Sequence, residues 1–110
     1  MGARTEIPPG TLYMLILKTL TRLGPMHGYG IAEHIQQTSD DVLTVEEGSL
    51  YPALQRMLVK GWVEAEWGLS DNNRRARFYR LTAAGRKQLQ AELAEFEKVT
   101  RAITRVIQPA

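Results

Sequence analysis

The chain has 110 residues, a formal net charge of +2, 44% hydrophobic residues, 24% charged residues and no cysteine. These values are typical of one soluble domain with one core, and the absence of cysteine excludes disulfides and thiolate metal sites. No apolar run reaches the length of about 18 residues that a membrane span needs, and the N-terminus lacks the regions of a secretory signal. We therefore expect a cytoplasmic protein without membrane contact, a metal or another cofactor.

The first half of the sequence predicts a short arm and two helices. Residues 1–10 contain two prolines and a glycine and are expected to form a flexible N-terminal arm. From Thr11 to Leu23 leucine and isoleucine recur at helical spacing, and Gly24 with the following proline ends this helix. A second helix is expected from Tyr29 to Gln37.

A third helix is expected to end near Lys60, before Gly61, but its start is ambiguous. Thr44 and Glu47 have the spacing of a capping box, which would start the helix at Thr44 and place Pro52 inside it. A start near Ser49 would instead leave the proline in the first turn, where its missing N–H costs little. The sequence leaves both starts open.

Residues 62–81 predict a β-hairpin with a basic return strand. Apolar and charged residues alternate in 62–67, a polar turn is expected at 68–75, and a second strand at 76–81. Residues 1–80 contain nine basic and nine acidic side chains, yet four arginines fall within residues 74–80, which contain no acid. A local basic cluster on a neutral body indicates one defined contact surface, although a solvated hairpin tip would have the same composition.

A last helix is expected from the N-cap residue Thr82 to about Ile107. Its apolar residues follow steps of four and three, which is typical of a helix that packs against a second helix. A helix of about 25 residues is too long to be covered by a body of about 80 residues, and a second copy of the chain is the simplest partner. The seam could also pack on the first helix of its own chain. The residues expected at the dimer interface are Leu12, Leu89, Leu93, Phe96 and Ile103.

The order of elements predicts a mainly α (α+β) fold, a winged helix-turn-helix with a two-stranded β wing and a long C-terminal dimerisation helix. The expected division is an arm at 1–10, a DNA-binding domain at 11–81 and the dimerisation helix at 82–110. In a helix-turn-helix the second helix enters the major groove with its N-terminal residues toward the bases. A two-fold dimer would present two such helices about 34 Å apart, to a pseudo-palindromic site.

Candidate DNA contacts follow from side-chain chemistry. Gln55 pairs well with adenine and Arg56 with guanine, whereas hydroxyls such as those of Ser49 and Tyr51 more often bind phosphates. The same sequence pattern is equally compatible with Tyr51 at the edge of the core and with Arg56 as a solvated residue that contacts nothing. The remaining candidates come from the start of the second helix and from the wing: His27, Tyr29, Arg74, Arg75 and Arg77.

His27 is also compatible with a purely structural role in the turn before the helix. Arg75 and Arg77 are two apart on the return strand and therefore share a face. The two tryptophans, Trp62 and Trp67, are five apart and therefore point to opposite faces. We expect core packing for Trp62 and an exposed or interfacial position for Trp67.

Three motifs resemble the PadR family of bacterial transcriptional regulators. They are His27-Gly28-Tyr29, the run Gly48-Ser49-Leu50-Tyr51-Pro52-Ala53-Leu54, and the run Phe78-Tyr79-Arg80-Leu81-Thr82-Ala83-Ala84-Gly85. The length, with one helix after the wing, resembles the short subfamily. The family often has an Arg-Pro pair in the wing, whereas this chain has Arg74-Arg75-Ala76.

The resemblance implies a winged-helix homodimer that binds double-stranded DNA, usually as a repressor, and responds to small apolar or aromatic effectors. The last helix, with help from the first, would form the dimer. An alternative is a winged-helix module that binds another protein. No nucleophile–base pair and no phosphate-binding glycine loop are recognisable, so catalysis is not expected.

Overall fold

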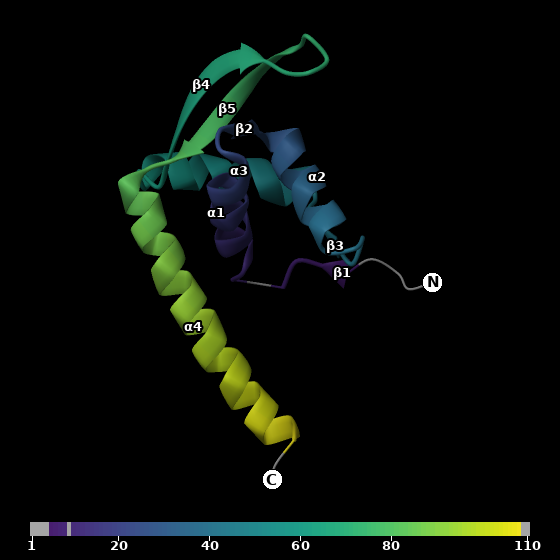
Figure 1. The fold of residues 1–110 in the computed structure, drawn as a ribbon, viewed down its shortest axis with the longest axis vertical. Helices are drawn as coiled ribbons and strands as arrows, with labels where there is room; N and C mark the ends of the chain where they lie inside the picture. Colours follow the sequence, from purple (N-terminus) through teal and green to yellow (C-terminus); the bar gives the residue numbers. More distant parts are fainter. Residues whose placement is uncertain (1–4, 9, 109–110) are drawn as a thin grey trace.

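The computed structural model describes residues 5–8 and 10–108, and it has the expected mainly α, winged-helix architecture. Figure 1 shows the shorter helices gathered at the centre, a β-hairpin above them and a long last helix leading away from the body. The helices are α1 Leu12–Leu23, α2 Gly28–Thr38, α3 Glu47–Val59 and α4 Ala83–Ile107. The strands are β1 Thr5–Glu6, β2 Met26–His27, β3 Leu43–Thr44, β4 Val63–Leu69 and β5 Arg75–Leu81.

The wing is a three-stranded antiparallel sheet in the order β2-β5-β4. The short strand β2, which the sequence did not predict, joins the start of α2 to the hairpin by pairing His27 with Phe78. In the hairpin itself Trp67 pairs with Arg77, and Leu69 with Arg75. Because side chains alternate along a strand, these four residues lie on one face of the wing.

The core lies where α1, α2 and α3 meet the base of the wing. Ile16, Leu17, Ile31, Leu54 and Met57 are completely buried there. The apolar stripes of three helices thus face one another, as expected for amphipathic helices around one core. Trp62 packs its ring edge-to-face on Tyr13 of α1 at a centroid distance of 5.4 Å and lies partly buried against this core.

Part of the N-terminal segment is ordered against the body, so the expectation of a flexible arm over residues 1–10 is wrong for Thr5 and Glu6. These two residues form β1, which pairs in parallel with Leu43 and Thr44 of β3. The backbone N–H of Thr5 also donates to the carbonyl of Val42 at 2.7 Å. Residues 1–4 and 9 lie outside the described residues.

The capping box at the start of α3 is not formed, and neither expected start of this helix is correct. Thr44 is held extended by its pairing in β3, and its hydroxyl is buried without a hydrogen-bond partner among the described residues. The helix begins at Glu47, with Glu46 as N-cap and no side-chain cap. Pro52 is therefore inside the helix, where its missing N–H leaves the carbonyl of Gly48 without a helical partner.

The end of α3 agrees with the end predicted from the sequence, near Lys60. Gly61 has φ +76°, its N–H donates to the carbonyl of Leu58, and the N–H of Trp62 donates to Met57. This pair of bonds is a Schellman motif, which needs a left-handed residue at the position of the glycine. The turn fixes the direction in which β4 leaves the helix.

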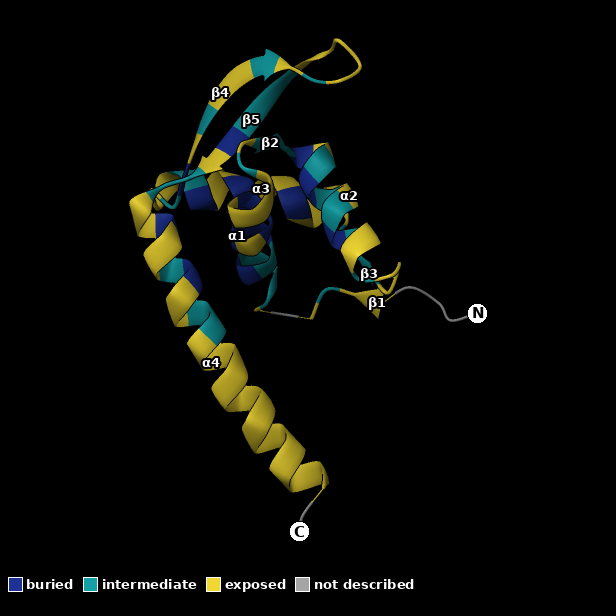
Figure 2. Cartoon of the chain, viewed as in Figure 1, coloured by how far each residue is buried: buried dark blue, intermediate teal, exposed yellow. Residues whose placement is uncertain are grey.

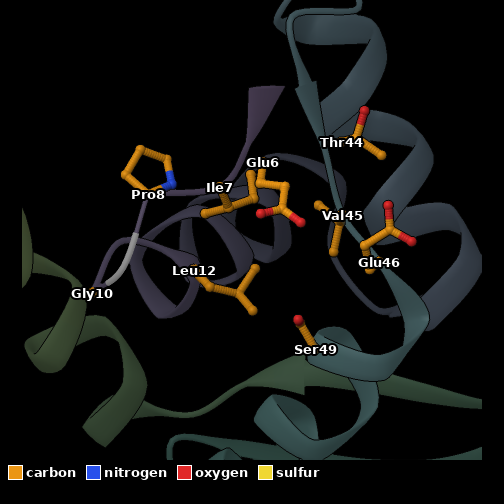
Figure 3. A pocket seen from close by; sticks show the side chains of 9 residues that line it. All are labelled: Glu6, Ile7, Pro8, Gly10, Leu12, Thr44, Val45, Glu46 and Ser49. Carbon is orange, nitrogen blue, oxygen red and sulfur yellow. The ribbon is translucent and has the colours of Figure 1, made fainter. Parts of the chain in front are cut away.

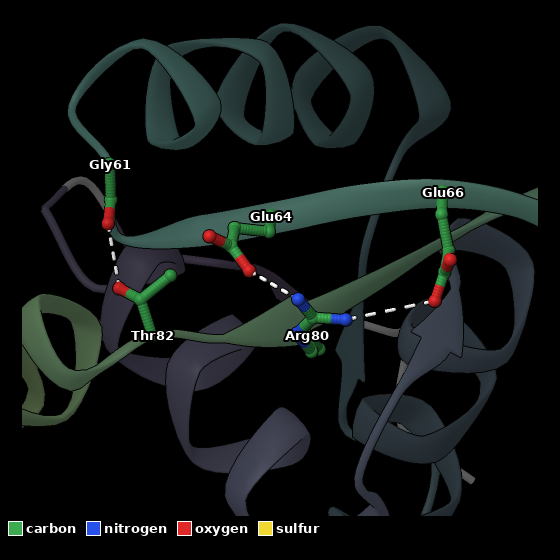
Figure 4. Close-up of polar contacts among 5 residues, drawn as sticks. All are labelled: Gly61, Glu64, Glu66, Arg80 and Thr82. Atoms are coloured by element: carbon green, nitrogen blue, oxygen red, sulfur yellow. Dashed lines mark hydrogen bonds and ion pairs between the residues drawn. The ribbon is translucent and has the colours of Figure 1, made fainter.

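Helix α4 begins beside the body and then extends away from it. Leu89 is buried, but Figure 2 shows that the C-terminal half of the helix is exposed on the visible faces. At its start the hydroxyl of Thr82 accepts from the N–H of Gly85 and donates to the carbonyl of Gly61 at 2.6 Å (Figure 4). None of the described helices combines the length and the apolar character needed to cross a lipid bilayer.

We expect Thr82→Ala to destabilise the fold by about 1–2 kcal/mol, because it removes an N-cap and leaves the Gly61 carbonyl without its donor. Thermal unfolding of the variant measures this loss. Thr82→Ser keeps the hydroxyl and is the matched control, expected to lose less than half as much. Equal losses for both variants would contradict the role of the hydroxyl.

Candidate nucleic-acid interface

Five of the nine residues predicted to bind DNA line one cleft. It lies between the start of α2, the first turns of α3 and the wing, and its lining residues are His27, Gly28, Tyr29, Tyr51, Trp67, Arg75, Ala76, Arg77 and Tyr79. The described part of this lining contains two arginines and no acidic residue. Two guanidinium groups beside hydroxyl and imidazole donors are the chemistry that binds a phosphate backbone.

Close packing of α2 on α3 brings the backbone at the start of α2 against the ring of Tyr51. A Cβ added at Gly28 would lie 2.7 Å from the ring of Tyr51, so only glycine allows this approach. His27 caps α2, because its Nδ1 accepts from the N–H of Gly30 at 3.0 Å. A neutral ring that accepts at Nδ1 has its proton on Nε2, which leaves one donor for a ligand. The structural and the DNA-binding interpretations of His27 are therefore compatible.

Tyr51 remains an O–H donor at neutral pH. Burial, then the carboxylate of Glu47 and finally the neighbouring Tyr79 raise the pKa of Tyr51 above its usual value of 10.0. All three effects disfavour the phenolate. A neutral phenol donates a hydrogen bond to a phosphate oxygen, whereas a phenolate would repel it.

The wing arginines of the cleft are held by an aromatic ring. The guanidinium carbon of Arg75 lies 4.6 Å from the centroid of Trp67, and that of Arg77 lies 5.9 Å from it. Arg77 also lies 5.9 Å from the ring of Tyr79. The candidate set from the sequence did not include Trp67. Trp67 lies opposite Arg77 in the hairpin, and this neighbour becomes known only when the pairing of the two strands is known.

Arg80 is separated from the other wing arginines by its charge partners. Figure 4 shows its guanidinium between two carboxylates of β4, with 2.5 Å to Glu64 and 3.6 Å to Glu66. These acids lie directly opposite or diagonal to Arg80 in the hairpin register, on the face away from Arg75 and Arg77. The four arginines that cluster in the sequence are thus divided in space: Arg75 and Arg77 line the cleft, Arg74 lies in the wing turn, and Arg80 is paired with acids on the other face.

An acidic groove borders the cleft on the side away from the wing. It runs between α2 and α3, shares Tyr29 and Tyr51 with the cleft, and contains Glu33, Asp41 and Glu47. Phosphates are repelled there and attracted on the arginine side. The charge distribution therefore favours a DNA backbone close to the wing.

The other four predicted DNA contacts lie outside the cleft. The side chain of Ser49 points into a separate pocket beside the N-terminal segment, together with Leu12 and Glu6 (Figure 3). Arg56 turns toward α1, where its Nε donates to the hydroxyl of Tyr13 at 2.5 Å. Gln55 is exposed on α3. Arg74 lies in the wing turn, where its backbone carbonyl accepts a hydrogen bond from the N–H of Ser70.

The residues predicted for the dimer interface divide into two groups. Phe96 and Ile103 are 44% and 53% exposed on α4, and Leu93 is partly buried at the start of the same stripe. Leu89 is only 6% exposed because it packs in the core of its own chain, and Leu12 lines the pocket of Figure 3. Val99, at 43% exposure, belongs to the exposed stripe although the sequence analysis omitted it.

A helix-turn-helix with a basic wing beside its second helix defines a class of DNA-binding proteins, the winged-helix proteins. Residues 16–91 match the model of the transcriptional regulator PadR-like family, and the chain belongs to this family. It is therefore a DNA-binding transcriptional regulator and not an enzyme. An uncharacterized protein X from Lysinibacillus sphaericus is 30% identical over 101 residues, which are 91% of each chain.

Solved structures of transcriptional regulators have the same fold over nearly the whole chain. A transcriptional regulator from Clostridium thermocellum is 26% identical and superimposes with a TM-score of 0.82, covering 90% of this chain and 95% of that one. A PadR family transcription regulator from Clostridium difficile R20291 is 25% identical, with a TM-score of 0.75 and coverage of 90% and 100%.

Proposed function

We propose that this regulator is a cytoplasmic bacterial repressor that binds a pseudo-palindromic operator as a homodimer. The observation that carries the proposal is the gathering of His27, Tyr29, Tyr51, Arg75 and Arg77 in one acid-free cleft. In each protomer α3 would enter the major groove while the wing contacts the adjacent backbone. A protein that occupies a promoter in this way excludes the transcription machinery, so repression is the expected outcome.

The surface of α4 supports the homodimer. Phe96, Val99 and Ile103 form an apolar stripe that the described part of the protomer leaves about half exposed, and a second copy offers an equal stripe. In a two-fold dimer the two stripes meet as the same patch on both subunits.

The charges of α4 support an antiparallel arrangement of the two copies. Glu92, Glu95 and Glu97 precede the basic residues Lys98, Arg101 and Arg105 along the helix. Two antiparallel helices that cross near the middle of this segment place the acids of one copy beside the bases of the other. A parallel arrangement would place like charges together, which is unfavourable.

A groove between α1 and α4 supports the response to an effector. It is lined by Tyr13, Met14, Phe96 and Val99, with Glu92 and Glu95 at its polar side. A small apolar or aromatic molecule in this groove would lie at the proposed dimer interface. Its binding would change the angle between the protomers, and with it the spacing of the two clefts, and would thereby release the operator.

Selection of duplexes from a random DNA pool tests the proposal. At about 150 mM salt, purely electrostatic binding is suppressed and sequence-specific complexes survive. We expect enrichment of a pseudo-palindrome with half-sites about 10 base pairs apart, one helical turn. A folded protein that enriches no sequence would contradict the proposal and favour the alternative of a winged-helix module that binds another protein.

A further inference from the structure

The most exposed large aromatic side chain of the wing is Trp67, and its contacts with Arg75 and Arg77 leave most of the ring in solvent. The side chain is 58% exposed, although burial of a tryptophan is strongly favourable and the core lies at the base of the same strand. By contrast, Trp62 is packed on Tyr13 and the core. A large apolar ring held in solvent beside two arginines indicates a contact surface.

Trp67 shares the cleft with the candidate DNA contacts and holds two of them in place. Its ring lies 4.6 Å from the guanidinium carbon of Arg75 and 5.9 Å from that of Arg77. Arginine side chains are long and lose conformational entropy when they bind, so a ring that orders them in advance lowers this cost. Cation–π contacts of this kind are strongest with tryptophan.

We infer that Trp67 contacts bound double-stranded DNA and is also a positioning residue that holds the guanidinium groups of Arg75 and Arg77 toward the phosphates. The inference rests on the proposed DNA-binding function and extends it. Trp67 lines the cleft together with Tyr29 and Tyr51, so a backbone bound there runs along the ring. The ring supplies apolar contact to the sugars of one strand, while the arginines neutralise the adjacent phosphates.

Tryptophan fluorescence tests the contact directly. The chain has two tryptophans, so Trp62→Phe leaves Trp67 as the only one, and Trp67→Phe leaves Trp62. The probe is a mixed-sequence duplex of about 24 base pairs at about 50 mM salt, where non-specific binding is tight. We expect the emission of Trp67 to shift to shorter wavelength and to change in intensity on binding, and the emission of Trp62 to remain constant.

The salt dependence of binding tests the positioning role. Trp67→Leu keeps every charge, so we expect about fivefold to tenfold weaker binding with an unchanged salt slope. Arg75→Gln, in contrast, should lower the slope by about one. Trp67→Phe retains an aromatic face and should bind within about threefold of the wild type. Val42→Ala, a change at a comparably exposed apolar residue outside both the wing and the cleft, is the control and should have no effect.

Two results would overturn the inference about Trp67 and leave the proposed DNA-binding function intact. They are binding by the Trp62→Phe variant with constant tryptophan emission, and wild-type affinity of Trp67→Leu. If the wild type binds neither this duplex nor any selected one, the proposed function itself fails, and the two failures are thus distinguished.

Discussion

Replacing Arg75 and Arg77 together with alanine is expected to weaken binding to every duplex by about 100-fold and to lower the salt slope by about two. Each guanidinium in the cleft is worth about one charge-assisted hydrogen bond to a phosphate, or about tenfold in affinity. Each also releases counterions when it binds. Titration of labelled duplexes at several salt concentrations measures both quantities.

The matched control is Arg80→Ala, because Arg80 is in the same strand and is already paired with Glu64 and Glu66. We expect less than a threefold change in affinity and no change in slope. Its exposed ion pairs contribute little to folding, so the variant should also be stable. An equal loss for Arg80→Ala would mean that the wing acts only through its total charge.

The double variant Phe96→Asp/Ile103→Asp is expected to abolish the dimer. A two-fold interface would bring four carboxylates into an apolar contact, which costs several kcal/mol and exceeds what a stripe of this size provides. Light scattering at micromolar concentration should show a mass that falls from about twice 12.4 kDa to 12.4 kDa. DNA affinity should fall by about 1,000-fold, because two linked half-site contacts become independent.

Ala94→Asp is the control for this variant, because Ala94 is exposed on the same helix and lies away from the stripe. It introduces one carboxylate per chain in the same helical context. We expect it to remain dimeric and to bind DNA normally. A dimer that survives in Phe96→Asp/Ile103→Asp would place the interface elsewhere.

Helical periodicity and end signals in the sequence predicted most of the fold. The boundaries of α1 and α4 were correct to within one residue, and the glycine after α3 has the expected left-handed backbone. The start of α3 was wrong because the pattern of Thr44 and Glu47 is local, whereas Thr44 is fixed by a strand pair with a segment nearly 40 residues earlier. A local pattern does not encode such a long-range pairing.

Only part of the candidate site could be predicted, because some of its features also depend on contacts between distant segments. His27, Tyr29 and Tyr51 belong to motifs, and the arginines form a visible run, so these residues were identified. The pairing of Arg80 with Glu64 depends on hairpin register, and the position of Trp67 depends on which face of the wing meets α3. Neither property is contained in a single segment of sequence.

If two identical clefts bind two halves of one operator, a selected full-site duplex must bind much more tightly than the same duplex carrying one scrambled half-site. Analytical ultracentrifugation gives the stoichiometry and titration gives the affinity of each complex. This mode of binding predicts two chains on one full site, and binding to the half-scrambled duplex that is at least about 100-fold weaker. Equal affinity for both duplexes, or one chain per full site, would contradict it.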